Sequence, residues 1–235
     1  MQVVMRIQRF DPDAEFEPRF QDFTVDNVAP TDAVLDILHR IKWEQDGSLT
    51  FRRSCAHGIC GSCGMNINNR NMLACSVLLQ DLKWKKPIRL EPLPGMSVLR
   101  DLAVDMTGFY DKYRAVRPYL INHDAPPERE RIQSNEDAES LFESAKCILC
   151  GCCTSSCPSA WTSDDYLGPA ALVKAYRFVF DTRDDGEDAR LDIVDSPNGV
   201  WRCHTIFNCV EACPKEIDVT GHLSRLKQAC VMRQV

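Results

Sequence analysis

Cysteine is the residue that most constrains this chain, because 13 of its 235 residues are cysteines and all but one fall in three clusters. Cys230 stands alone, and the clusters are Cys55, Cys60, Cys63 and Cys75; Cys147, Cys150, Cys152, Cys153 and Cys157; and Cys203, Cys209 and Cys213. An odd number of clustered cysteines, in a chain without an export signal, argues against a disulfide framework and for metal ligation. The long gap between the first and second clusters predicts two metal-binding domains.

Composition excludes several classes of function. The formal net charge is −6 and the isoelectric point is about 5.4, so no basic surface for nucleic acid or anionic lipid is expected. No stretch reaches the roughly 18 uninterrupted apolar residues of a membrane span. The start, MQVVMRIQRF, alternates like a strand and lacks the features of a signal or transit peptide. We therefore expect a globular protein that is not secreted.

The first hundred residues predict a small α+β domain. Thr31 or Asp32 is expected to cap a helix whose apolar residues Val34, Leu38 and Ile41 recur at helical spacing. Short strands are predicted at 3–10, around 23–25, and at 49–52, 64–67, 71–75 and 87–91. The first two strands are expected to pair across a turn at 11–18.

The remainder of the chain has a helical pattern. Helices are predicted at 101–116, at 134–146 with Ser134 as the cap, at 168–181 and at 218–232. The Pro-rich, charged composition of segment 118–133 predicts a surface loop that connects the predicted helices 101–116 and 134–146. We expect an N-terminal α+β domain over 1–105 and a C-terminal all-α domain over 106–235.

The first cluster has the spacing C-x4-C-x2-C followed by the distant Cys75. This is the plant-type ferredoxin spacing for a [2Fe–2S] cluster held by four cysteines. The alternative is a structural zinc loop, but zinc sites usually repeat a short gap twice. Gly58, Gly61 and Gly64 allow the loop to wrap closely, so that backbone N–H groups can point at the sulfurs. His57 is not needed as a ligand, because four thiolates complete the set.

The second and third clusters share one template. Residues Cys147 to Pro158 read C-x2-C-x2-C-x3-C-P, the bacterial ferredoxin run, with Cys152 as an extra cysteine. Residues Cys203 to Pro214 fit the same template, except that Ile206 stands at the second cysteine position.

Ligands for two clusters follow from the rule that the fourth cysteine of each run binds the other cluster. One set, expected to hold a [4Fe–4S] cluster, is Cys147, Cys150, Cys153 and Cys213. The other set supplies only three thiolates: Cys157, Cys203 and Cys209. Because isoleucine cannot bind iron, this second set favours a [3Fe–4S] cluster, with a [4Fe–4S] cluster that has water at its open corner as the alternative. Cys152 and Cys230 are expected to be small buried apolar residues.

The whole pattern resembles the iron–sulfur subunits of the succinate dehydrogenase and fumarate reductase family. The matching motifs are Phe51-Arg-Arg-Ser-Cys55, Ile59-Cys-Gly-Ser-Cys63-Gly64, Asp105-Met-Thr-Gly-Phe109-Tyr, Cys147-Ile-Leu-Cys150, Tyr166-Leu-Gly-Pro169-Ala and Arg202-Cys-His204. Two departures are Ala56-His57, where a charged pair is more usual, and one residue missing between Cys157 and Gly168. The resemblance implies a plant-type ferredoxin-like (β-grasp) domain followed by a helical bacterial-ferredoxin-like domain.

The resemblance also implies the function. A partner flavoprotein oxidises succinate at its FAD, and the three clusters relay the electrons to a membrane quinone, as in the tricarboxylic acid cycle and aerobic respiration. The quinone site of the family maps onto Pro158, Ser159, Trp161, His204 and Ile206. The alternative is that Trp161 and His204 only pack around the cluster. The chain itself is expected to carry no catalytic residue for succinate.

The implied setting is a multisubunit complex. The resemblance implies a flavoprotein on the N-terminal domain and membrane-anchor subunits, which can carry haem b, on the C-terminal domain. The expected location is peripheral, on the cytoplasmic face of a bacterial inner membrane. Three other functions stay open at this point: a fumarate reductase relay, a soluble multi-cluster ferredoxin and a structural zinc protein.

Overall fold

The computed structural model describes residues 1–14 and 16–233, and these form two compact units. The first unit contains 1–106 together with 148–156, and the second contains 107–147 together with the residues from 157 onward. The chain therefore changes units twice within the second cysteine cluster. The predicted division into 1–105 and 106–235 differs in that it places 148–156 with the second domain.

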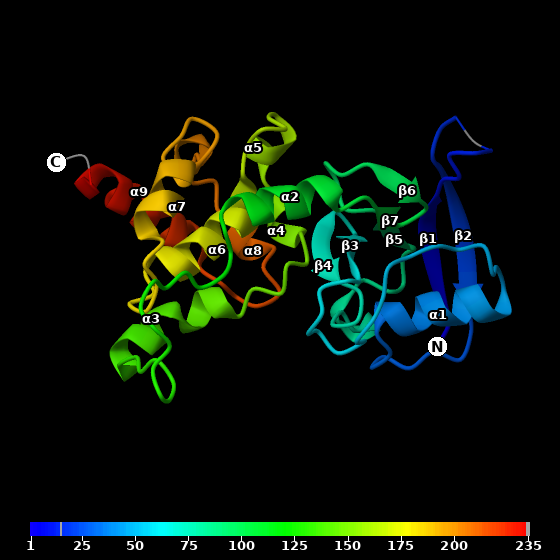
Figure 1. The fold of residues 1–235 in the computed structure, drawn as a ribbon. Coiled ribbons are helices and arrows are strands. Elements are labelled where there is room, and N and C mark those ends of the chain that lie inside the picture. The colour runs from blue at the N-terminus through cyan, green and yellow to red at the C-terminus, as the bar shows by residue number, and fades with distance from the viewer. Residues whose placement is uncertain (15, 234–235) are drawn as a thin grey trace. The chain divides into compact units, whose positions relative to one another are not determined.

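A five-stranded mixed sheet forms the centre of the first unit (Figure 1). Its order is β2-β1-β5-β3-β4, with β1 parallel to β5 and the other pairs antiparallel. The strands are β1 (Val3–Arg9), β2 (Arg19–Val25), β3 (Gly64–Ile67), β4 (Arg70–Leu73) and β5 (Ile88–Glu91). The predicted turn at 11–18 includes residue 15, which lies outside the described residues.

Alternation in β1 buries one face of this sheet. Val3, Met5 and Ile7 are all at most 1% exposed, as expected for a strand with one face on the core. Helix α1 (Val34–Glu44) contributes the buried side chains Leu38 and Ile41 to the core. Helix α1 and the predicted strands other than 49–52 are confirmed here.

Two local predictions in this unit are wrong. Helix α1 begins after Ala33 rather than at Thr31 or Asp32. The Asp32 carboxylate instead accepts from Ala29 N, and Asp36 accepts from Ala33 N at 3.0 Å. Residues 49–52 form no strand, because Thr50 N donates to a side-chain carboxylate and not to a neighbouring strand.

The predicted helix at 101–116 is also wrong over its first part. Strands β6 (Val98–Arg100) and β7 (Ala103–Val104) form a hairpin there, and α2 begins only at Thr107 and ends at Ala115. Asp101 lies in the turn of this hairpin with φ = +47°, a conformation that interrupts a helix. The first unit also contains a 3₁₀ turn over Leu79–Asp81 and the short helix α4 (Cys152–Ser155).

A buried ion pair explains why Asp101 is placed in this turn. Its carboxylate accepts from Arg9 Nε at 2.9 Å, from Phe10 N at 3.0 Å and from Thr50 N at 2.8 Å. Arg9 is 5% exposed and Asp101 is 2% exposed. Arg9 also donates to Asp46 and Ser48. One carboxylate thus joins three segments that are far apart in the sequence.

The second unit consists of helices and connecting loops, as predicted (Figure 1). Its helices are α2, α3 (Asn135–Ala145), α5 (Pro158–Trp161), α6 (Gly168–Val179), α7 (Glu187–Val194), α8 (Asn208–Glu211) and α9 (Val219–Arg233), with a 3₁₀ turn at Val200–Arg202. The Ser134 hydroxyl caps α3 by accepting from Asp137 N, as predicted. Helix α6 is the central element, because it packs against α2, α3, α7 and α9.

A second buried ion pair holds the loops of this unit. Arg190 and the Asp184 side chain are fully buried against each other. Arg190 also donates to the carbonyls of Arg117 and Tyr119, and Asp184 accepts from Ile121 N. The segment after α2 is thereby fixed against the start of α7. Among the described residues, no helix is both long and apolar enough to cross a membrane.

Breaking the buried Arg9–Asp101 pair should destabilise the first unit. Asp101→Asn keeps the shape of the side chain but removes its charge, and we expect it to lower the free energy of unfolding by about 3 kcal/mol. The exposed pair Arg6–Asp22 is the matched control, and Asp22→Asn should cost about 1 kcal/mol or less. Chemical denaturation of the cluster-loaded protein measures both. Equal losses would show that burial of the pair is unimportant.

Candidate metal centres

The loop of the first cysteine cluster points backbone N–H groups at its own sulfurs. Gly58 N lies 3.2 Å from Cys75 Sγ. Cys60 N and Ile59 N lie 3.3 and 3.4 Å from Cys55 Sγ. Such bonds stabilise the negative charge on a ligand sulfur and raise the reduction potential of a bound cluster. The predicted wrapping of this loop is therefore confirmed.

Left-handed backbone produces the wrapped loop. Ala56, Gly58 and Gly61 have φ values of +59°, +74° and +72°. The two glycines adopt this conformation without strain. The His57 side chain is hydrogen-bonded through Nδ1 to the carbonyl of Cys55. This hydrogen bond braces the loop.

The electrostatics of this loop fit a positively charged iron cluster. Backbone N–H groups, that of His57 foremost, lower the pKa of the Cys55 thiol to about 6. Burial, together with the neighbouring Cys75 and Cys60, raises the pKa of the Cys63 thiol to about 12. The loop thus stabilises negative charge at Cys55 and opposes it at Cys63, where the positive charge of bound iron is needed most. The ligand set and its surroundings fit a [2Fe–2S] cluster.

Sequence reasoning missed Ser76, whose hydroxyl lies 3.7 Å from Cys75 Sγ. Because a ligand thiolate has no proton, the hydroxyl is the donor when iron is bound. The only sequence signal is that Ser76 follows a ligand directly.

The complete second run is divided between the two units. Cys150 and Cys153 belong to the first unit, whereas Cys147 belongs to the second. Cys152 is fully buried, as predicted. Its thiol donates to the Cys150 sulfur and lowers the pKa of that thiol, so it is more than an apolar filler.

The complete and incomplete runs have the same backbone conformation. The residue before the second cysteine position is left-handed in both, with φ = +55° at Leu149 and +57° at Thr205. The residue after it is left-handed too, with φ = +83° at Gly151 and +69° at Phe207. A four-residue helix follows each of them, α4 and α8. Ile206 therefore stands where the complete run has Cys150, and the backbone on either side of it has the same conformation.

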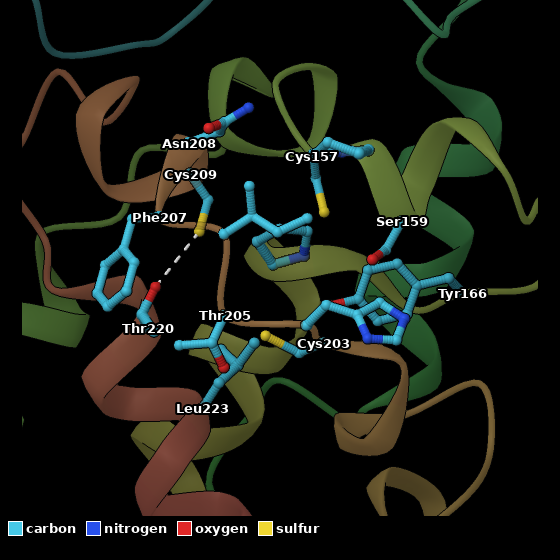
Figure 2. A pocket seen from close by; sticks show the side chains of 14 residues that line it. Cys157, Ser159, Tyr166, Cys203, Thr205, Phe207, Asn208, Cys209, Thr220 and Leu223 are labelled. Atoms are coloured by element: carbon cyan, nitrogen blue, oxygen red, sulfur yellow. Dashed lines mark hydrogen bonds between the residues drawn. The ribbon is translucent and has the colours of Figure 1, made fainter.

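The three cysteines of the incomplete set surround a pocket in the second unit. Figure 2 shows the sulfurs of Cys157, Cys203 and Cys209 directed toward the same space. The pocket encloses about 330 Å³, counting its part open to solvent. Its other walls include Pro158, Ser159, Tyr166, His204, Ile206 and Phe207.

The surroundings of this pocket include donors from helix α9. Thr220 Oγ1 lies 3.7 Å from Cys209 Sγ (Figure 2), and Lys227 Nζ donates to the Cys203 carbonyl at 2.9 Å. Burial, aided by the charges of Cys157 and Cys203, raises the pKa of the Cys209 thiol. Three crowded thiolates fit a cluster that places positive iron between them. No sequence motif connects α9 with these cysteines, so its role was missed.

Four of the five predicted quinone residues line the same pocket: Pro158, Ser159, His204 and Ile206. Trp161 is not among the residues of its wall, and it ends α5 with 52% of its surface exposed. Ile206 and Phe207 are about half exposed as well, at 48% and 52%. Large apolar side chains therefore reach solvent beside the pocket.

Among the described residues, no three or more His, Cys, Asp or Glu side chains are grouped so that they could hold a metal ion. In an iron–sulfur cluster the cysteines are shared among several iron atoms, two on each iron of a [2Fe–2S] cluster and one on each ligated corner of a [4Fe–4S] cluster, so four ligand sulfurs do not gather around one ion.

Two family models match the chain, and together they define a multi-cluster iron–sulfur protein. The first, a 2Fe-2S iron-sulfur cluster binding domain, matches residues 4–111. The second, a 4Fe-4S dicluster domain, matches residues 143–217. These matches exclude the alternative hypothesis of a structural zinc protein.

Curated proteins give the family. Succinate dehydrogenase [ubiquinone] iron-sulfur subunit 1, mitochondrial, of Oryza sativa subsp. japonica is 46% identical over 226 residues, which are 94% of this chain and 80% of that protein. The succinate dehydrogenase iron-sulfur subunit of Coxiella burnetii is 43% identical over 223 residues, 94% of each chain. A chain of the Mycobacterium smegmatis Sdh1 complex in the apo form superposes with a TM-score of 0.84 at 27% identity, covering 99% of this chain and 96% of that chain. The chain belongs to the family of succinate dehydrogenase iron–sulfur subunits, and it transfers electrons in that enzyme.

The Ser76 hydroxyl should tune the first cluster. Ser76→Ala removes a donor to the Cys75 sulfur, which destabilises the more negative reduced state. A hydrogen bond worth about 0.5–1.5 kcal/mol corresponds to a fall in potential of about 20–60 mV for one electron. EPR-monitored redox titration of the [2Fe–2S] signal measures it. Ser54→Ala, on the same exposed loop, is the control, and an unchanged potential in Ser76→Ala would contradict the assignment.

Proposed function

We propose that the pocket of Cys157, Cys203 and Cys209 holds a [3Fe–4S] cluster, with Ile206 at the vacant fourth corner. The observation that supports this most strongly is the shared backbone of the two runs, left-handed before and after the second ligand position in each. The loop thus has three ligand positions for this cluster, of which only those of Cys203 and Cys209 carry thiolates, and Cys157 of the other run supplies the third thiolate. A [4Fe–4S] cluster with water at the open corner is the alternative that the test below distinguishes.

The other ligand sets complete the proposal. Cys55, Cys60, Cys63 and Cys75 hold the [2Fe–2S] cluster, and the four ligands of the [4Fe–4S] cluster are Cys147, Cys150, Cys153 and Cys213. When bound, the three clusters supply a series of one-electron carriers. The chain's own residues hold the sulfurs apart, donate N–H groups to them and exclude water from the buried Cys63 and Cys209.

We also propose that the three-cysteine pocket adjoins the quinone site. The wall contains His204, which can donate to a quinone carbonyl, and Ile206, which offers an apolar surface. Pro158 and Ser159 are the first two residues of α5, and the exposed Trp161 is its last residue. An amphipathic head group fits such a surface of aromatic, apolar and donor groups.

The exposed apolar surface supports docking to other subunits. Trp161, Ile206 and Phe207 are each about half exposed, and Trp201 is 43% exposed. Exposed large apolar side chains such as the neighbouring Ile206 and Phe207 mark an interaction surface, and we assign it to membrane-anchor subunits, which can carry haem b. A flavoprotein with FAD is assigned to the first unit. In this arrangement the chain is a peripheral subunit on the cytoplasmic face of a bacterial inner membrane, acting in a succinate dehydrogenase that reduces quinone.

The direction of the reaction and the quinone site can be tested in one preparation. The purified native complex should reduce quinone with succinate faster than it reduces fumarate with quinol, and the opposite ranking would identify a fumarate reductase. Trp161→Leu or His204→Ala should then slow quinone reduction roughly five- to hundredfold, since a lost hydrogen bond costs on the order of 1–3 kcal/mol. Dye reduction at the flavin should be nearly unchanged. Equal losses in both assays, with intact cluster EPR, would contradict the quinone assignment.

The vacant ligand position has its own test. Ile206→Cys restores the complete run, so the iron content should rise from about nine to about ten per chain. The EPR signal of the oxidised three-iron cluster should disappear, because an oxidised [4Fe–4S] cluster of this kind is diamagnetic. Ile206→Ala changes the side chain without adding a thiolate and should keep the signal.

Two outcomes would overturn the assignment of Ile206. A wild-type protein without a three-iron signal, prepared with and without air, would show that the ligand allocation is wrong. A three-iron signal that survives in folded Ile206→Cys would show that this side chain does not face the open corner.

A further inference from the structure

Two cysteine-bearing segments that are far apart in the sequence touch within the first unit. Gly61 lies between the ligands Cys60 and Cys63, and its backbone packs directly on the segment 148–152. A Cβ added at Gly61 would lie 2.8 Å from Cys150 Cα and 2.8 Å from the Ile148 carbonyl oxygen. These distances are shorter than van der Waals contact, so the space admits only a glycine.

Gly64 makes a second close approach to the same segment. A Cβ at Gly64 would lie 2.9 Å from the Cys150 carbonyl oxygen and 3.5 Å from Cys152 Sγ. Gly64 is the first residue of β3, and its φ is not in the left-handed region. Glycine is therefore required at this position because a side chain has no room, and not because of the backbone conformation.

A polar contact fixes the other end of the segment. Asn71 Nδ2, on β4, donates to Ser156 Oγ at 2.8 Å, and Asn66 Nδ2 donates to Asn71 Oδ1 at 2.9 Å. Asn71 is only 6% exposed, so this chain of bonds is shielded from water. Helix α4 thus lies on β4, and the segment 148–156 is held at both ends against the first unit.

We propose that Gly61 and Gly64 are positioning residues for electron transfer between the [2Fe–2S] and [4Fe–4S] clusters. The inference rests on the ligand sets of the proposed function, in which Cys60 binds the first cluster and Cys150 the second. The route from the Cys60 sulfur to the Cys150 sulfur has two covalent parts, one from Cys60 to Gly61 and one within Cys150. A single van der Waals contact, between Gly61 and Cys150, joins the two parts. Because electron tunnelling falls steeply with each added gap, a side chain inserted at that contact slows transfer.

The contact can be separated from backbone strain by a matched pair of variants. Gly61 and Gly58 have nearly the same φ, +72° and +74°. An added Cβ at Gly58 meets only the Ser76 hydroxyl, at 3.0 Å. Gly61→Ala and Gly58→Ala therefore share the strain, but only Gly61→Ala pushes against Cys150. Gly58→Ala pushes on the Ser76 hydroxyl beside Cys75, so it is expected to shift the potential of the first cluster and not its coupling to the second. Gly64→Ala adds the steric push without a left-handed backbone.

The test uses the assembled complex and a readout other than turnover. Reduction of the [4Fe–4S] cluster should speed the spin relaxation of the reduced [2Fe–2S] cluster, as measured by microwave power saturation. We expect this acceleration to be lost or clearly weakened in Gly61→Ala and Gly64→Ala and kept in Gly58→Ala. Amide hydrogen exchange should show faster exchange of 148–152 in the first two variants alone.

The possible results separate the two levels of the proposal. A wild-type complex that lacks either cluster signal would overturn the ligand allocation. Both clusters present, with relaxation and exchange unchanged in Gly61→Ala and Gly64→Ala, would overturn the positioning role alone. If Gly61→Ala does not assemble, Gly64→Ala decides, since it carries no left-handed strain. A loss of relaxation in Gly58→Ala equal to that in Gly61→Ala would assign the effect to strain and overturn the inference.

Discussion

Thiolates brought close together repel one another, and every cysteine site in this chain has to offset that repulsion. The N–H groups around Cys55 do so locally and lower the pKa of its thiol to about 6. Cys63 and Cys209 have the opposite environment, because burial and neighbouring sulfurs raise their pKa values. The positive charge of bound iron offsets the part of the thiolate repulsion that the protein groups leave. The left-handed turns, the short helices and the donors from α9 are all arranged around this one requirement.

The incomplete run shows that loop geometry and ligand identity are separate properties. Ile206 has no sulfur, yet the residues on either side of it have the same left-handed backbone as those beside Cys150. The loop therefore does not depend on a thiolate at this position. Ile206 is about half exposed, so the loop that has one cysteine fewer presents an apolar residue to its surroundings.

Sequence reasoning was most accurate where the signal is local. Alternation placed β1 and periodicity placed α1, α6 and α9, because each pattern reflects one buried face. It failed at 49–52 and at 101–106, where the decisive partners are distant. Asp101 resembles an ordinary helix residue until Arg9 and Thr50 N are found to bind its carboxylate. The same holds for Arg190, whose burial depends on Asp184 and on carbonyls some seventy positions away.

The sequence by itself determined the three cysteine clusters, their spacings and the replacement of one cysteine of the template by Ile206, because the cysteines of one loop are separated by a few residues and spacing records this directly. It also determined the family, through motifs along nearly the whole chain. Only the tertiary structure decided that 148–156 joins the first unit, that Gly61 touches Cys150 and that Thr220 approaches Cys209. These contacts join residues whose separation in the sequence carries no periodic signal, and close packing alone brings them together.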